Sequence, residues 1–207
     1  MNFTTTNIIR ENAQGLSTVR MEDDMFNNRE ICCFGDICEQ TANEITAQIR
    51  YLTRQDPNAE ITLYINSNGG EVNSGMAIYD AMRISSAPIR TVCTGVAASM
   101  ASLLFTAGDV REMYPHSRVM IHDPLIPNTG GSALRLKNIS DSLMETRALI
   151  AEIIAEHSAK PVEEILELTA ADTWFNAKEA VEYGLADKII HFSKKKRNKI
   201  TSAKRGS

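Results

Sequence analysis

Short runs rich in β-branched and other apolar residues alternate along the chain with segments in which apolar residues recur every three or four positions. Runs of the first kind predict strands, and segments of the second kind predict helices. Alternating strands and helices in turn predict an α/β fold in which helices cover a sheet. The predicted strands are 30–34, 61–66, 89–94, 118–122 and 187–192.

Helical spacing predicts the helices that lie between these strands. Ile45, Ile49 and Leu52, for example, share one face of a segment that ends near residue 53. The apolar segment 95–105 is interpreted as the end of a strand that runs directly into a helix. In all, short helices are predicted at 39–53, which contains these three residues, and at 73–85, 161–169 and 176–183.

The longest helical pattern covers about 132–157, with one apolar face and one charged face. A helix of this length either leaves the body to meet a partner subunit or packs against its own sheet, and the periodicity favours neither. Its apolar stripe consists of Leu136, Ile139, Leu143, Ile150, Ile153 and Ile154.

The chain has 207 residues, of which 43% are apolar and 23% are charged, so a single domain with one core is expected. Its net charge is −4, and removing the seven Lys and Arg residues of 191–207 leaves −11 on the rest. An acidic body argues against a nucleic-acid surface. The basic end, 193–207, is predicted to be a disordered tail, with contact to an acidic partner or a membrane surface as the alternative.

No charged and then apolar leader is visible in residues 1–20, and the apolar stretch 95–108 is shorter than the roughly 20 residues that cross a bilayer. We therefore expect a soluble, cytoplasmic protein that does not bind membranes through its body. The cysteines do not have the spacing of a disulfide framework or a zinc site, so reduced and mostly buried thiols are expected. They are Cys32, Cys33, Cys38 and Cys93.

Three segments carry residues suited to acyl transfer. In the first, a predicted strand ends at Gly69 and Gly70 before a helix, so that backbone N–H groups without side-chain cover can hold a negatively charged oxygen. A plain turn is the alternative. In the second, Ser99 lies where a strand meets a helix, as a nucleophile or as a helix N-cap, and the N–H of Met100 can join the oxyanion donors. Ser102, one turn later, is interpreted as a small packing residue.

The third segment ends in His122, which follows a predicted strand and can accept a proton from a serine. The remaining histidines, His116, His157 and His191, are interpreted as surface residues, His157 at a helix end where the dipole favours a cation. A carboxylate is needed to orient the base, and spacing does not choose between Asp123, Asp172 and Asp187.

These segments resemble the proteolytic subunit of the Clp ATP-dependent protease, a family of serine endopeptidases. The resemblance covers about 28–190. It implies a crotonase-like α/β spiral, with Ser99 as nucleophile, His122 as base, Asp172 as its orienting acid, and the N–H groups of Gly70 and Met100 as oxyanion donors. The matching blocks are 64–70, 75–80, 95–100, 117–124 and 179–187.

The resemblance also implies an assembly. Residues 1–27 would form an N-terminal axial segment, and 28–192 the proteolytic domain with a handle at about 125–157 that stacks two seven-membered rings into a tetradecamer. Unfolded chains would be cleaved inside the rings. No cofactor or metal is implied for this subunit, because a partner unfoldase of the Clp family uses the ATP.

The sequence departs from the family pattern at several positions. An added carboxylate at 123 would favour the charged form of the base if it lay close. The two alanines replace a pair that helps to lock ring to ring, and the N-terminus lacks the usual apolar anchor for an unfoldase. The departures are Asn68 for Pro, Asp123 for Gln, 125–131 for a Gly-rich strand, and Ala170-Ala171 for Asp-Arg.

Three functions are therefore compared: an intact peptidase, a low-activity or structural subunit that requires a second Clp proteolytic subunit, and an acyl-CoA enzyme of the crotonase fold. The serine and histidine argue against the third, since crotonase chemistry normally uses a positioned carboxylate instead of a nucleophilic hydroxyl.

Overall fold

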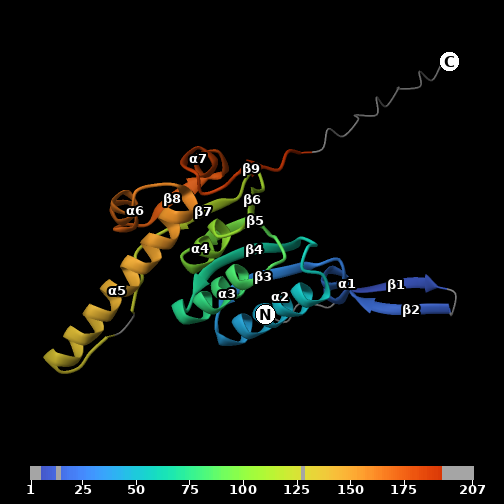
Figure 1. The fold of residues 1–207 in the computed structure, drawn as a ribbon, viewed down its shortest axis with the longest axis horizontal. Helices are drawn as coiled ribbons and strands as arrows, with labels where there is room; N and C mark the ends of the chain where they lie inside the picture. Colours follow the sequence, from blue (N-terminus) through green and yellow to red (C-terminus); the bar gives the residue numbers. More distant parts are fainter. Residues whose placement is uncertain (1–5, 13–14, 127–128, 193–207) are drawn as a thin grey trace, which may run out of the picture.

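The computed structural model describes residues 6–12, 15–126 and 129–192. A mostly parallel sheet forms the centre of the molecule (Figure 1), which confirms the predicted α/β class. Strands β3, β4, β5, β6 and β9 follow one another across this sheet, while β7 pairs with β5 and β8 pairs antiparallel with β7. The strands are β3 Glu30–Ile37, β4 Ile61–Gly70, β5 Ile89–Ala98, β6 Val110–Met113, β7 Arg118–Ile121, β8 Thr173–Asn176 and β9 Lys188–Ile189.

Strand β5 has two neighbours on the same side, and this division of the sheet creates the site described below. Residues 90–93 pair with β6, whereas 96–98 pair with β7. At the division, the side-chain Oδ1 of Asn66 accepts a hydrogen bond from the N–H of Val96. A Cβ on Gly95 would lie 2.5 Å from that same oxygen, so a side chain there would displace the Asn66 amide. The end of β5 is thereby directed along β7.

One face of the sheet is covered by helices. Strand β4 alternates between buried residues, including Ile61, Leu63 and Ile65, and more exposed ones, as expected for a strand with one covered face. Helices α2 (Glu39–Gln55) and α3 (Val72–Ile84) lie side by side on this face of the sheet, α2 against β3 and α3 against β4 (Figure 1). Helix α4 (Met100–Thr106) is buried along its whole length and contacts β4 and β5.

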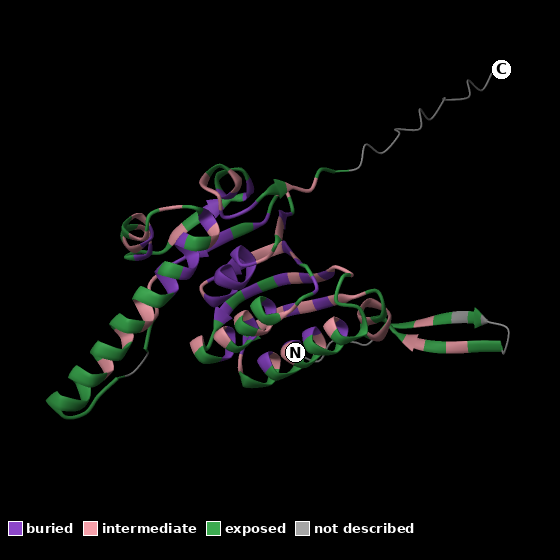
Figure 2. Cartoon of the chain, viewed as in Figure 1, coloured by how far each residue is buried: buried purple, intermediate pink, exposed green. Residues whose placement is uncertain are grey.

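The long helix α5 (Ala133–Ser158) has two different halves. Its buried residues all lie in 150–158, where the helix meets the body, while residues 133–149 are exposed or half-buried and project away (Figure 2). Packing against the body therefore describes the second half only. Helices α6 (Val162–Thr169) and α7 (Ala177–Tyr183) follow, and Asn176 and Glu179 form a capping box at the start of α7.

The amino-terminal region contains two strands and a helix that were not predicted. Strands β1 (Asn7–Asn12) and β2 (Gly15–Arg20) form an antiparallel hairpin that extends from the body (Figure 1). Helix α1 (Met21–Asn27) connects the hairpin to β3. The hairpin is short, and most of its described side chains are exposed, so it has no strong apolar pattern.

Two other elements were missed and one was overestimated. Strands β6 and β8 have four residues each and, unlike the equally short β7, contain no run of three apolar residues that would indicate a strand. The predicted strand 187–192 pairs only at 188–189. The basic tail predicted at 193–207 lies outside the described residues. So does Pro127, in the segment 125–131 that differs from the family pattern. Within the described ranges, no helix combines the length and hydropathy that a membrane span requires.

Candidate active site

Ser99 occupies a strained turn between β5 and α4. Its backbone has φ 56° and ψ −128°, a conformation that costs a non-glycine residue on the order of 1–3 kcal/mol. Ser99 is the N-cap residue of α4, but its side chain makes no capping hydrogen bond. The N–H of Ser99 instead donates to the carbonyl of Met120 at 3.0 Å, which ties the turn to β7. The hydroxyl is thereby left to face the next strand.

His122 follows β7 and reaches this hydroxyl. Parallel pairing sets Ala98 opposite Met120, so the residues just beyond each strand end lie close together. The distance between His122 Nε2 and Ser99 Oγ is 2.9 Å, a hydrogen bond in which the hydroxyl donates when the imidazole proton is on Nδ1. Only 14% of the His122 side chain is exposed, so the pair is largely shielded from water.

Asp172 completes the row through the antiparallel β7–β8 register. Ile121 is opposite Thr173, so the next pair outward is His122 and Asp172. Asp172 Oδ1 lies 3.3 Å from His122 Nδ1, and 66% of the carboxylate side chain is exposed. The other two carboxylates that spacing had left open are paired elsewhere, Asp123 with Arg147 and Asp187 with Arg111.

The glycine pair at the end of β4 lies against the Ser99 turn. A Cβ on Gly69 would be 2.7 Å from the Cβ of Ser99 and 3.0 Å from the backbone N of Met100. Gly70 has φ 156°, and a Cβ there would be 2.0 Å from the carbonyl oxygen of Ile37. Any side chain at either position would collide with backbone, so this segment is more than a plain turn.

The second serine and one of the remaining histidines pack within the fold outside the Ser99–His122–Asp172 row. The Ser102 hydroxyl is buried and donates to the Ser99 carbonyl at 2.6 Å, as expected for a packing residue. The prediction for His157 was wrong, because it is half-buried near Tyr79 and its pKa lies below its ordinary value. Burial is the main cause of the lowered pKa and the charge of Arg83 the next, and together they outweigh the helix dipole.

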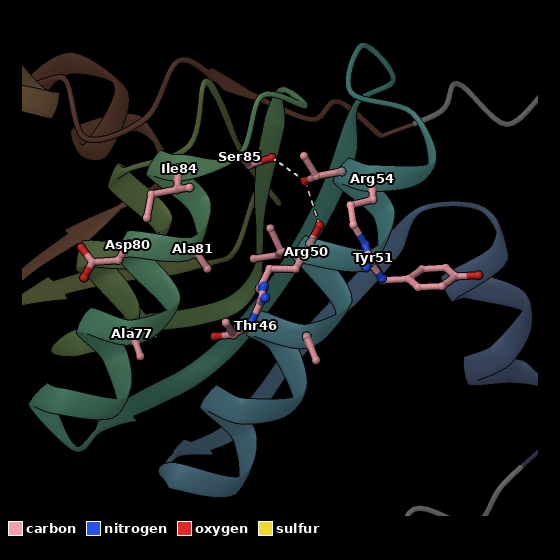
Figure 3. A pocket seen from close by; sticks show the side chains of 12 residues that line it. Thr46, Arg50, Tyr51, Arg54, Ala77, Asp80, Ala81, Ile84 and Ser85 are labelled. Atoms are coloured by element: carbon pink, nitrogen blue, oxygen red, sulfur yellow. Dashed lines mark hydrogen bonds between the residues drawn. The ribbon is translucent and has the colours of Figure 1, made fainter.

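A shallow groove of about 360 Å³ runs beside the site between the end of β4, the loop after His122 and α5. It is lined in part by Val72, Leu125, Ile126 and Leu143. A separate groove of about 760 Å³ lies between α2 and α3 (Figure 3), and it is lined by none of the candidate site residues.

The cysteines are unpaired thiols in the described part of the chain, two buried and two partly exposed. Burial raises the pKa of Cys33 to about 12 and those of Cys32 and Cys93 to about 11. Among the described residues, no group of three or more His, Cys, Asp or Glu side chains is arranged to hold a metal ion.

A hydroxyl, an imidazole and a carboxylate that lie next to one another in this order are the arrangement found in serine hydrolases. The family model of Clp protease matches residues 13–193, so the chain belongs to the Clp protease family and is a serine peptidase, a hydrolase. Its fold is of the α/β type that the resemblance implied. This membership argues against the acyl-CoA alternative.

Similar curated proteins carry the same description. The chain is 39% identical to an ATP-dependent Clp protease proteolytic subunit from Porphyromonas gingivalis, over 91% of this chain and 85% of that protein. It is 37% identical to the protein of that name from Ligilactobacillus salivarius, over 94% and 99%. It is 40% identical to an ATP-dependent Clp protease proteolytic subunit 2 from Cutibacterium acnes, over 80% and 78%.

Sequence reasoning missed one feature beside the site. Arg147 on α5 binds Asp123, the residue after the histidine, at 2.6 Å. The sequence did single out the unusual Asp123, but nothing in it indicated which cation would be its partner. The added carboxylate is thus paired with a guanidinium instead of with the imidazole.

Proposed function

We propose that Ser99, His122 and Asp172 are the catalytic triad of this peptidase. The observation that carries the proposal is the continuous row of contacts, 2.9 Å from Ser99 Oγ to His122 and 3.3 Å from His122 to Asp172. His122 Nε2 would take the serine proton as Oγ attacks a peptide carbonyl, and it would return that proton to the leaving amine. Asp172 would hold the imidazole in the required tautomer.

The oxyanion formed in this attack would be held by the backbone N–H groups of Gly70 and Met100. Met100 is the first residue of α4, where a backbone N–H has no acceptor within its own helix. The tight approach of Gly69 to the N of Met100 supports the placement of both donors at one oxygen. Donors fixed in this way stabilise charge that develops only in the transition state.

The substrate would be an unfolded chain that lies in the groove beside the site. Leu125 and Ile126 are largely exposed there, and both adjoin the segment that follows His122. Apolar lining of this kind would accommodate side chains next to the bond that is cleaved. The proposed reaction needs water as co-substrate and no cofactor.

Assembly would restrict access to the site. We propose that the chain forms stacked seven-membered rings, with the projecting half of α5 as the handle between rings and residues 1–27 as the axial segment. Exposed apolar side chains along that half, including Leu134, Leu136 and Met144, support such a contact. A Clp-family unfoldase would use the ATP and deliver unfolded chains, and the cytoplasm is the expected location.

A second candidate is a subunit that requires a different Clp proteolytic subunit for full activity. Ala170 and Ala171 are exposed and uncharged where the family usually has a pair that joins rings. Two of the similar proteins, from Cutibacterium acnes and Nocardia farcinica, are themselves named subunit 2. The carboxylate of Asp172 is also mostly exposed, and burial by a partner would fix its position.

Reaction with a fluorophosphonate probe, followed by mass spectrometry, tests the triad. Modification of Ser99 by the isolated chain supports the complete peptidase, and modification only after a second subunit is added supports the second candidate. We expect Ser99→Ala to abolish cleavage of a fluorogenic peptide and to leave the sedimentation coefficient unchanged. Persistent cleavage by this variant would show that another residue is the nucleophile.

A further inference from the structure

The catalytic segments of this chain are connected to the long helix through one side chain. Arg147 lies on α5 close to the place where the projecting half joins the body, since Leu149 is half exposed and Ile150 is buried. Its Nε donates to Asp123 Oδ2 at 2.6 Å, and a second guanidinium nitrogen donates to the carbonyl of Leu166 at 2.7 Å. Arg147 therefore bridges the segment after His122 and helix α6.

Both ends of this bridge lead to the proposed catalytic row. Asp123 adjoins His122, and its N–H donates to the carbonyl of Thr169 at 2.7 Å. The hydroxyl of Thr173 donates to the carbonyl of Leu168 at 2.6 Å and so fixes the other side of the loop that carries Asp172. A movement of α5 that displaced the guanidinium would shift both supports of the imidazole.

The charges make this bridge stronger than an ordinary surface contact. The Arg147 side chain is 22% exposed and that of Asp123 is 31% exposed, so solvent screens the pair only in part. Asp123 Oδ1 is buried without a hydrogen-bond partner among the described residues. Loss of Arg147 would thus leave a partly buried carboxylate unpaired, a situation that proteins seldom tolerate.

We propose that Arg147 and Asp123 are positioning residues, which couple the placement of helix α5 to the alignment of His122 with Ser99 and Asp172. The proposal rests on the proposed triad. It gives the projecting half of α5 a second role, because a partner bound to residues 133–149 would act on the catalytic row through Arg147. Neither residue touches the reacting atoms.

The test compares Asp123→Asn, Arg147→Gln and the double variant with the wild-type chain, all in the assembled state selected by gel filtration. The readouts are kcat and KM for a fluorogenic peptide and the rate at which a fluorophosphonate modifies Ser99. We expect kcat and the modification rate to fall roughly 10- to 100-fold with KM nearly unchanged, because a small displacement of catalytic groups has effects of this size.

The proposal also predicts how the variants rank by loss of activity. Arg147→Gln should be more severe than Asp123→Asn, since it breaks two contacts, and the double variant should be no worse than Arg147→Gln alone. Arg147→Lys keeps a charge near Asp123 and should recover part of the activity. Glu182→Gln is the matched control, because it breaks an exposed pair, Glu182–Lys178, that takes no part in the catalytic row or in the Arg147 bridge.

Several outcomes would overturn the proposal. Unchanged kcat and modification rate in both single variants would do so, as would strictly additive losses in the double variant or equal losses in Arg147→Lys and Arg147→Gln. A change in KM alone would assign the pair to substrate binding. Failure of the triad itself would appear separately, as a wild-type chain in which the probe does not modify Ser99.

Discussion

At the residue scale, the site depends on positions where the backbone is strained or closely packed. Ser99 is held at positive φ, and Gly69 and Gly70 come so close to neighbouring backbone that no Cβ can be added. The strain at Ser99 leaves its hydroxyl free of the capping bond that serine usually makes. Ser99 thus gives up local stability for the geometry that the proposed attack on a carbonyl would require.

Gly70→Ala tests the oxyanion donors. The new Cβ would lie 2.0 Å from the Ile37 carbonyl oxygen, so the end of β4 must move and carry the Gly70 N–H away. We expect kcat to fall about 100- to 1,000-fold, the usual effect of losing one such donor. Gly35→Ala is the control, because Gly35 also has positive φ but open space around its Cα. Equal losses of kcat in both variants would attribute the effect to backbone strain alone.

Thiol modification tests the cysteine environments. Burial keeps Cys33 and Cys93 protonated, with pKa values of about 12 and 11, whereas hydrogen bonding from Thr41 lowers the pKa of the partly exposed Cys38. Because the thiolate is the reactive form, iodoacetamide at pH 8 should modify Cys38 first in the folded chain. Peptide mapping over time gives the order, and urea-unfolded protein, in which all cysteines react, is the control.

At the element scale, α5 serves both the core and the surface. Its second half supplies Ile150, Ile153 and Ile154 to the core, and its first half presents apolar side chains that are exposed in the described part of the chain. Arg147 lies at the boundary between these halves. The same boundary explains why periodicity alone favoured neither packing nor projection, since the helix does both in succession.

His157, near the end of α5, makes folding sensitive to mild acid. Its pKa in the folded state lies below the ordinary 6.5, so the unfolded chain binds its proton more readily. The free energy of unfolding is therefore not reduced by this histidine above about pH 6.5, and it decreases as the pH falls below that value. We expect the melting temperature to decrease between pH 7 and pH 5.5, and His157→Gln to decrease less.

The exposed His191→Gln variant controls for the loss of one histidine. Differential scanning calorimetry at several pH values gives the comparison. If the wild-type chain and His157→Gln follow the same pH dependence, the buried environment of His157 does not govern acid sensitivity.

At the scale of the whole molecule, two features extend from the body, the β1–β2 hairpin and the free half of α5 (Figure 1). Neither feature has a buried residue between 7 and 20 or between 133 and 149 where the structure describes burial, and both would gain contacts in the proposed assembly. The loop that carries Asp172 adjoins Ala170 and Ala171, so the proposed ring contacts would lie close to the proposed catalytic row.

Restoring the family pair tests whether assembly limits activity. We expect the double substitution Ala170→Asp and Ala171→Arg to increase the fraction of stacked rings in sedimentation velocity experiments, and to raise peptide cleavage in parallel. If the second candidate holds, the isolated wild-type chain sediments as smaller species, which a second Clp proteolytic subunit converts to larger ones. A stable, active double ring of the wild-type chain alone would reject the need for a partner.

The sequence by itself determined the elements whose patterns are local. The helices with buried faces, such as α2 with Ile45, Ile49 and Leu52, and the long central strands follow from spacing that repeats within a few residues. The residue types for acyl transfer were also visible, because glycine pairs, a serine before an apolar helix and a histidine after a strand are read from neighbouring positions. The short strands β6 and β8 were not predicted, because four residues show no period and neither strand has the apolar run that revealed the equally short β7.

Only the tertiary structure decided which of those residues meet. Ser99, His122 and Asp172 are brought together by the pairing of β5 with β7 and of β7 with β8, and strand pairing is set by contacts between segments remote in the chain. The same long-range packing placed Arg147 against Asp123 and turned Asp187 away to Arg111. The spacing of residues along the sequence does not predict such contacts, because their free energy comes from surfaces that touch only in the folded chain.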